Sequence, residues 1–93
     1  MTTATEAKVI AKIKKEAAAL KLPIMYTIHG CDGCVKLIKK WEAEGVKYVE
    51  RRAEMDQATM DVAKILGSIV PIVVYPDGRI EEGFVGGIGC YIR

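Results

Sequence analysis

The stretch IMYTIHGCDGC, residues 24–34, decides the fold because it joins an apolar segment directly to two closely spaced cysteines. Residues 24–28 are rich in strand-forming side chains and lie between a proline and a glycine, which predicts a short buried strand. The apolar residues that follow recur at helical spacing and predict a helix that ends at Gly45. They are Val35, Leu37, Ile38 and Trp41. Cys31 and Cys34 therefore lie where a strand leads into a helix.

Segments on both sides of this stretch carry their own signals. In chain order, the other predicted elements are a basic amphipathic helix at 5–21, a strand at 46–51, a helix between Asp56 and Gly67, and a hairpin of strands at 72–75 and 80–84 joined by a turn at 76–79. A strand–helix–strand unit followed by a hairpin predicts a mixed sheet with a crossover helix. The predicted class is α/β, with a thioredoxin-like arrangement of a four-stranded mixed sheet flanked by helices.

Length and composition limit the classes of protein to which the chain can belong. Its 93 residues, 51% hydrophobic and 28% charged, fit one globular domain, residues 1–93. The formal net charge of +2 is too small to predict a nucleic-acid partner, and no apolar run is long enough for a membrane span. Residues 1–8 lack the pattern of a secretory signal. We therefore expect a cytoplasmic monomer.

The position of the two cysteines has a chemical consequence. The first turn of a helix carries unpaired backbone N–H groups and the positive end of the helix dipole, which favour a thiolate at Cys31. Lys36 and Lys39 add positive charge, whereas Asp32 opposes it. Cys34 follows one helical turn later, close enough to form a small disulfide with Cys31. A thiol with a lowered pKa is also a better leaving group, which suits thiol–disulfide exchange.

Two other interpretations of the pair are inert core residues and a zinc site. A structural zinc ion takes four ligands, and the only further Cys or His residues are His29 and Cys90. His29 is too close in sequence to Cys31 to complete a comfortable tetrahedron. No metal site is therefore predicted, and redox chemistry is favoured.

Pro71 precedes the strongest strand signal of the chain, at residues 72–75. A trans proline fits awkwardly beside a paired strand, so the sequence predicts a cis Val70–Pro71 bond, a form found in only about 5–6% of X–Pro bonds. The segment between Cys34 and Pro71 is long enough for one strand, one helix and their loops. The chain can therefore return Pro71 to the cysteines.

With these motifs in this order, the chain resembles a glutaredoxin or a glutaredoxin-like redoxin of the thioredoxin superfamily. The resemblance spans about residues 23–88. The motifs that carry it are YTIHGCDGC at 26–34, VP at 70–71 and FVGG at 84–87. It implies that Gly86 and Gly87 form a turn beside the active site and take part in substrate binding.

The same resemblance implies the roles of the other site residues. Cys31 is the exposed nucleophile that attacks a substrate disulfide, and Cys34 is the resolving thiol, so that oxidation yields a Cys31–Cys34 disulfide. Pro71 is the cis-proline, and the backbone of Val70 beside it pairs with an extended substrate. The implied substrates are protein disulfides, with glutathione as a possible co-substrate and no bound cofactor.

Several departures from the family pattern bear on the electron donor. Asp32 and Gly33 replace the usual Pro-Tyr pair, and Ile28 stands where a lysine commonly holds a glutathione carboxylate. An N-terminal helix, residues 1–22, precedes the core at 23–93, whose C-terminus is short. Glutathione and a thioredoxin reductase-like enzyme are therefore both open as reductants.

Alternatives stay open for the function and for three modulating residues. The cysteine pair also suits a carrier of a metal ion or a bridging iron–sulfur cluster, and the basic helix at 5–21 suits an interaction module. His29 is either a proton carrier for Cys31 or an exposed loop residue, and Asp32 opposes the thiolate. Cys90 is either an incidental thiol or part of a regulatory or second disulfide.

Overall fold

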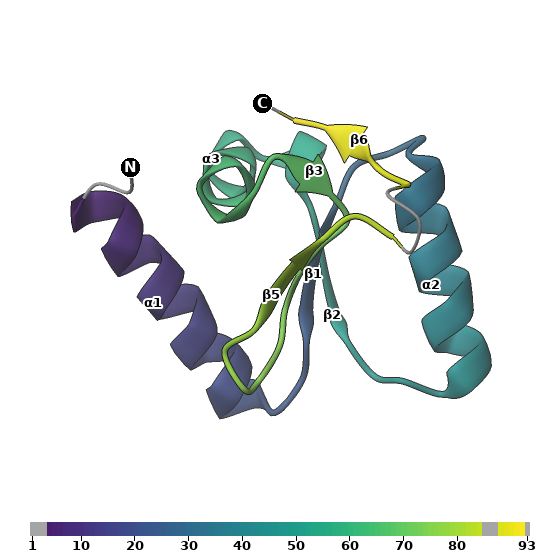
Figure 1. Cartoon of the computed structure of the whole chain (residues 1–93), viewed down its shortest axis with the longest axis horizontal. Coiled ribbons are helices and arrows are strands. Elements are labelled where there is room, and N and C mark those ends of the chain that lie inside the picture. Colours follow the sequence, from purple (N-terminus) through teal and green to yellow (C-terminus); the bar gives the residue numbers. More distant parts are fainter. Residues whose placement is uncertain (1–3, 85–87, 93) are drawn as a thin grey trace.

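The computed structural model describes residues 4–84 and 88–92 of the chain (Figure 1). Its helices are α1 (Ala4–Leu20), α2 (Asp32–Glu44) and α3 (Gln57–Leu66), with a short 3₁₀ helix, η1 (Ala53–Met55), before α3. Its strands are β1 (Ile24–Thr27), β2 (Val49–Arg52), β3 (Ile69–Val70), β4 (Ile72–Val74), β5 (Ile80–Glu82) and β6 (Cys90–Tyr91). None of the helices within these described ranges is both long and apolar enough to cross a membrane.

Four strands form a mixed sheet in the order β2-β1-β4-β5. β1 runs parallel to β2 and antiparallel to β4, and β4 and β5 form an antiparallel hairpin. Met25 of β1 pairs with Glu50 of β2 on one side and with Val73 of β4 on the other. The predicted α/β class and four-stranded mixed sheet are thus confirmed, with β1 as a central strand.

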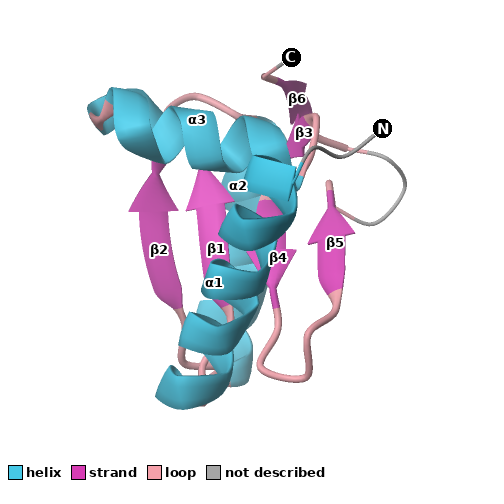
Figure 2. Cartoon of the chain, turned by 90° about the vertical axis from the view of Figure 1, so that its left-hand side faces the viewer, coloured by secondary structure: helices cyan, strands magenta, loops and turns pink. Residues whose placement is uncertain are grey.

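Helices cover both faces of this sheet: α1 and α3 lie on one face and α2 lies on the other (Figures 1 and 2). Side chains of β1 alternate between the two layers, as the two-residue repeat of a strand requires. Ile24 and Tyr26 join the larger core beside α1 and α3, whereas Met25 packs with Leu37 and Trp41 of α2. Burial on both faces explains why β1 is an unbroken apolar run rather than an alternating one.

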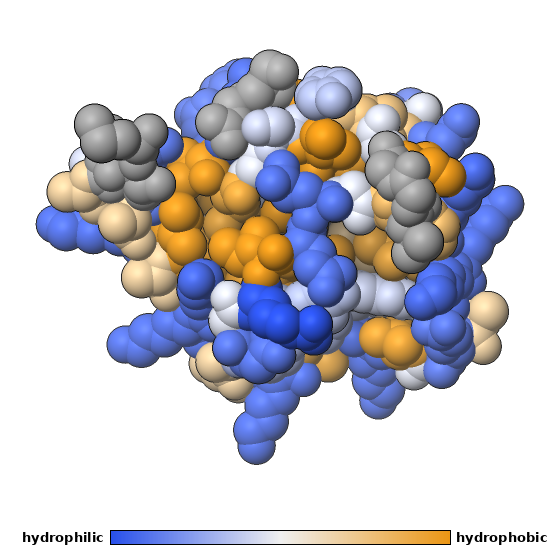
Figure 3. Space-filling model, in the orientation of Figure 1, coloured by the Kyte–Doolittle hydropathy of each residue, from blue (hydrophilic) through white to orange (hydrophobic). Residues whose placement is uncertain are grey.

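The N-terminal amphipathic helix α1 packs on this sheet. Ile13 and Ala17 are its buried residues and belong to the larger core. Glu16 forms a bidentate ion pair with Arg51 of β2, with N–O distances of 2.9 and 2.6 Å, and Arg51 also donates to the Tyr26 hydroxyl at 3.1 Å. The hydrogen bonds and charge of Arg51 hold the pKa of Glu16 below its usual value. Some apolar surface still shows between α1 and α3 (Figure 3).

The start of β2 differs from the sequence prediction. The expected strand began at Val46, but β2 begins at Val49. Gly45 ends α2 in the left-handed conformation, with φ of 72°, and the Val46 N–H donates to the Trp41 carbonyl oxygen at 2.9 Å. Val46 is therefore part of the helix cap, and pairing starts only where the Val49 N–H reaches the Pro23 carbonyl oxygen at 2.9 Å.

A second, two-stranded sheet is absent from the sequence prediction. β3 pairs antiparallel with β6, which sets Ile69 opposite Tyr91 and Val70 opposite Cys90. The Ile92 N–H extends the pairing by donating to a backbone carbonyl oxygen, that of Ser68, at 2.9 Å. Strands of two residues are too short to show a periodic pattern, so hydrophobic periodicity could not reveal this sheet. It places the end of the described chain beside the start of β4.

Replacing Ile13 by alanine should destabilise the fold, because Ile13 is only 5% exposed and lies in the core between α1 and the sheet. We expect the free energy of unfolding to fall by about 2–4 kcal/mol in a urea titration followed by circular dichroism. Leu20→Ala is the matched control, since Leu20 lies on the same helix but is 46% exposed, and its loss should stay below about 1 kcal/mol. Equal losses in the two variants would contradict the described packing of α1.

Candidate functional site

Helix α2 begins directly after the first cysteine of the pair. Cys31 is its N-cap residue: the backbone there is extended, with φ of −91° and ψ of 118°, and the Val35 N–H donates to the Cys31 carbonyl oxygen at 3.0 Å. Asp32 is the acidic residue of the first turn. The side chain of Cys31 therefore lies at the positive end of the helix dipole, as the sequence predicted.

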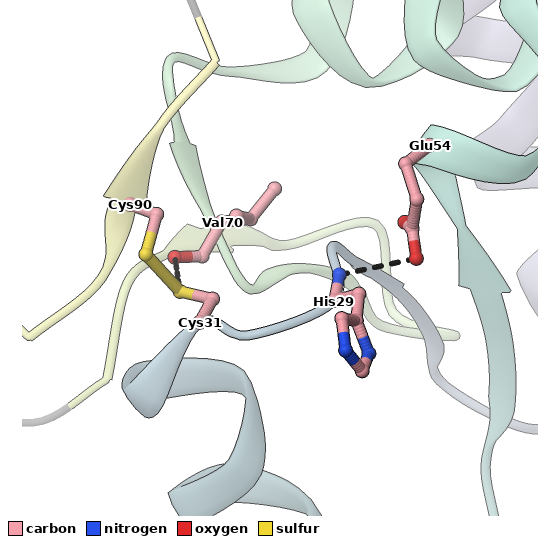
Figure 4. The surroundings of a disulfide bond; sticks show 5 residues. All are labelled: His29, Cys31, Glu54, Val70 and Cys90. Atoms are coloured by element: carbon pink, nitrogen blue, oxygen red, sulfur yellow. Dashed lines mark hydrogen bonds between the residues drawn. A yellow bond between two sulfur atoms is a disulfide. The ribbon is translucent and has the colours of Figure 1, made fainter.

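Cys31 is bonded to Cys90 of β6 (Figure 4). Their Cα atoms are 6.0 Å apart, although 59 residues separate them in the sequence. The bond leaves Cys31 buried, at 1% exposed, and leaves Cys34 as a free, buried cysteine. The sequence prediction differs on both points, because it made Cys31 an exposed nucleophile and paired it with Cys34. The reason for the difference is that β6 pairs with β3 beside the start of α2 and brings Cys90 onto Cys31.

Val70 and Pro71 adjoin the disulfide. The peptide bond between them is cis, as predicted, and both residues are buried. The Cys31 Sγ lies 3.8 Å from the Val70 carbonyl oxygen (Figure 4). A disulfide sulfur carries no proton, so this approach is a contact in the oxidised chain, whereas the reduced Cys31 thiol can donate a weak hydrogen bond there. Gly86 and Gly87, the other predicted substrate-binding residues, lie outside the described residues.

Cys34, in the first turn of α2, is 2% exposed and borders a groove of about 190 Å³. The polar residues that line this groove include Thr27, His29, Glu50 and Arg52. Burial raises the pKa of the Cys34 thiol, and the negative charges of Glu50 and Glu54 raise it further, whereas a hydrogen bond with the Ile28 backbone lowers it. Cys34 is therefore a protonated thiol at neutral pH.

The predicted modulators have different surroundings. His29 is exposed, its backbone N–H donates to Glu54 Oε1 at 3.1 Å, and its imidazole does not point toward the disulfide (Figure 4). Asp32 is exposed as the first residue of α2. Cys90 is half-buried and bonded to Cys31, so of its two interpretations the structure favours participation in a disulfide over an incidental thiol.

Two contributors to the site carry no motif that marks them. Glu50 accepts a hydrogen bond from the Thr27 hydroxyl at 2.8 Å, and its carboxylate therefore lies at the groove that Cys34 borders. Strand β6 is the second contributor. One signal for β6 did exist, since three cysteines form at most one intramolecular disulfide and leave Cys90 to compete with Cys34 for Cys31.

Comparison with known proteins gives no match: no protein-family model, no curated protein and no solved structure matches the chain. Within residues 4–84 and 88–92, the Cys, His, Asp and Glu side chains form no group of three or more that could hold a metal ion. What the site can do is therefore inferred from its own chemistry. Its distinguishing feature is a set of three sulfurs, one at the N-cap of α2, one in its first turn and one on strand β6.

The surroundings of Cys34 predict slow modification at neutral pH. In the disulfide-bonded chain, iodoacetamide should alkylate Cys34 more slowly at pH 7 than it alkylates cysteine in the unfolded chain, because the thiolate is the reacting form. Since the folded-state pKa is raised, the rate should go on rising about tenfold per pH unit beyond the pH at which the unfolded chain levels off. Mass spectrometry of quenched samples measures both rates.

Glu50→Gln tests the electrostatic part of this shift, because it removes a negative charge but keeps an acceptor for the Thr27 hydroxyl. It should lower the pKa of Cys34 and speed alkylation at pH 7. Glu44→Gln is the control, since Glu44 is exposed in the last turn of α2, and it should leave the rate unchanged. If the alkylation rate of Cys34 in the folded chain levels off at the same pH as in the unfolded chain, the assigned environment of Cys34 is wrong.

Proposed function

We propose that the chain is a thiol–disulfide oxidoreductase in which Cys31 and Cys34 exchange a dithiol for a disulfide with other proteins or with glutathione. The observation that carries the proposal is the position of Cys31. This cysteine is the N-cap of α2 and is already bonded to Cys90. Cys90 lies on β6, which pairs with β3. A helix N-terminus favours the thiolate form that both attacks disulfides and leaves from them.

The arrangement of the strands supports a thioredoxin-like fold for this function. A parallel β1–β2 pair flanks α2 in the chain, and an antiparallel β4–β5 hairpin completes the order β2-β1-β4-β5. This is the arrangement expected from the resemblance to glutaredoxin-like redoxins. The proposed setting is the cytoplasm, where thiols are kept reduced and a small carrier of this kind finds its electron donor.

The proposed reaction has two exchange steps. The Cys31 thiolate attacks one sulfur of a substrate disulfide; a bond from Cys31 to that sulfur forms, and the other substrate sulfur leaves as a thiolate. Cys34, once deprotonated, attacks the Cys31 Sγ and releases the second substrate sulfur. The substrate gains two electrons and the chain loses two, because its Cys31 and Cys34 thiols have become a disulfide. A dithiol reductase or glutathione then returns the two electrons and restores both thiols.

Val70 is the proposed docking point for the substrate backbone. Its carbonyl oxygen lies 3.8 Å from the Cys31 Sγ, and β3, to which it belongs, already pairs with one extended segment. A substrate that lies along β3 presents its cysteine to Cys31, because pairing fixes the distance of each residue from the strand. Pro71, directly after Val70, ends the stretch of β3 that can be paired.

Cys31→Ser should abolish this activity, because the variant has no nucleophile at the start of α2. The fully reduced chain would be mixed with a fluorescent-labelled oxidised peptide disulfide, and reduction followed as the rise of fluorescence on cleavage. The wild type should reduce the substrate in a step that consumes its own thiols, and the variant should match the rate without protein. Thermal unfolding of both chains checks that the serine leaves the fold intact. A Cys31→Ser chain that keeps the wild-type rate would overturn the proposed function.

A further inference from the structure

Strand β6 occupies the edge of β3. β3 lies outside the four-stranded sheet, and within the part of the chain that the structure describes, β6 is its one strand partner. Val70 is opposite Cys90 in this pairing, and Cys90 is the residue bonded to Cys31. A separate peptide that paired with β3 and brought a cysteine to Cys31 would have to follow the same path. Residues 88–92 therefore show how such a peptide would be held.

Two glycines make this path narrow. A Cβ atom at Gly33, inside the Cys-x-x-Cys turn, would lie 2.7 Å from the Ile88 carbonyl oxygen. A Cβ atom at Gly89 would lie 2.5 Å from the Val70 carbonyl oxygen. Neither glycine has a positive φ, so the close approach of backbones, and not the backbone conformation, accounts for both. The position before the cysteine therefore admits glycine and excludes larger residues.

The two positions after the cysteine set different requirements. Tyr91 is 76% exposed, so the residue next to the cysteine has room for any side chain. Ile92 is partly buried and packs against the larger core, so the residue after that meets an apolar surface. The path thus fits an extended peptide with glycine, cysteine, any residue and an apolar residue in that order.

We propose that the edge of β3 beside the first turn of α2 binds extended peptides of the pattern glycine–cysteine–any residue–apolar residue, and that residues 88–92 are an internal copy of such a substrate. The proposal rests on the proposed function of Cys31 and names its substrate class. In the disulfide-bonded chain the internal copy occupies this edge of β3. An external peptide gains access when Cys90 is released.

Release of Cys90 requires no outside oxidant or reductant. The Cys34 thiolate attacks the Cys31 Sγ, the Cys31–Cys34 bond forms as the Cys31–Cys90 bond breaks, and Cys90 leaves as a thiolate that takes up the proton lost by Cys34. One disulfide replaces another, so the oxidation state of the chain does not change. β6 is then held to β3 by non-covalent contacts alone, and a peptide of the same pattern can take its place. The dithiol reductase or glutathione of the proposed function supplies the two electrons that reduce the Cys31–Cys34 bond, and the restored Cys31 thiol then attacks the disulfide of the bound peptide.

The specificity is tested with a chain in which Cys31 is the sole cysteine, Cys34→Ser/Cys90→Ser. The probe is a synthetic peptide with the sequence of residues 88–93, its cysteine linked as a disulfide to thionitrobenzoate. Attack by Cys31 releases thionitrobenzoate, whose absorbance gives a second-order rate constant. The peptide with Gly89→Val should react roughly tenfold more slowly or worse, because its backbone no longer fits against Val70. The peptide with Tyr91→Ala should react within about twofold of the parent.

The same substitution in the chain gives a reciprocal control. Adding Gly89→Val to the Cys34→Ser/Cys90→Ser chain weakens the fit of its own segment and should raise the rate with the parent peptide several-fold. Each rate is divided by the rate of the same peptide with free cysteine, which removes differences in intrinsic reactivity. Circular dichroism checks that the added substitution leaves the fold unchanged. If it does not, the comparison of the two peptides still tests the proposal, because it uses the chain without Gly89→Val.

Mapping the disulfides completes the test. The oxidised Cys34→Ser chain should contain the Cys31–Cys90 bond. The inference is overturned if Cys90 stays a free thiol in that chain, or if the parent and Gly89→Val peptides react equally with Cys31. These outcomes are separable from failure of the proposed function, which the reduction assay of the wild type decides. If the wild type reduces disulfides but Cys31 reacts equally with the parent and Gly89→Val peptides, the proposed substrate class is wrong and the proposed activity stands.

Discussion

Burial of β1 on both faces is the constraint on which the site depends. All four of its residues are buried between helical layers, so the end of the strand is held at a fixed point and the chain enters α2 with Cys31 at the N-cap. β1 also runs antiparallel to β4, with Tyr26 opposite Ile72. Because antiparallel neighbours place the end of one strand beside the start of the other, the residues before β4 must lie next to those after β1. Val70 therefore meets Cys31 as a consequence of sheet register.

The first turn of α2, at Gly33, and residues 88–92 are complementary parts of one surface. A side chain at position 33 would collide with the Ile88 carbonyl oxygen, which would lie 2.7 Å from its Cβ atom. A glycine there gives up helix propensity, by about 1 kcal/mol relative to alanine. Close approach of residues 88 and 89 explains why it is used. Gly33 and Gly89 are thus linked, because each allows the backbone of one segment to approach the backbone of another along the path of residues 88–92.

Elements with a long apolar pattern could be predicted from the sequence, and those set by tertiary approach could not. Enough residues to show a period or a turn signal are present in β1, α2, α3 and the β4–β5 hairpin. The cis Val70–Pro71 bond could also be predicted, from the position of the proline before a strand. β3 and β6 have two residues each, too few for any period. The Cys31–Cys90 bond depends on this unseen pairing, since Cys34 is nearer in sequence. The charge of Glu50 beside Cys34 likewise follows from the parallel register of β1 and β2.

The two cysteines of α2 lie in opposite electrostatic environments, and this sets the order of the proposed exchange. Cys31 lies at the helix N-terminus, which favours its thiolate, whereas burial and the nearby acids Glu50 and Glu54 raise the pKa of Cys34. Of the other charged groups near that groove, Arg52 is paired with Glu54 at 2.8 Å and His29 is exposed. In the proposed exchange, Cys31 attacks first from the start of the helix, and resolution by Cys34 waits for deprotonation of a buried thiol. Exchange of a bond between Cys31 and a partner cysteine by Cys34, whether that partner is Cys90 or a substrate sulfur, therefore starts with the loss of this proton.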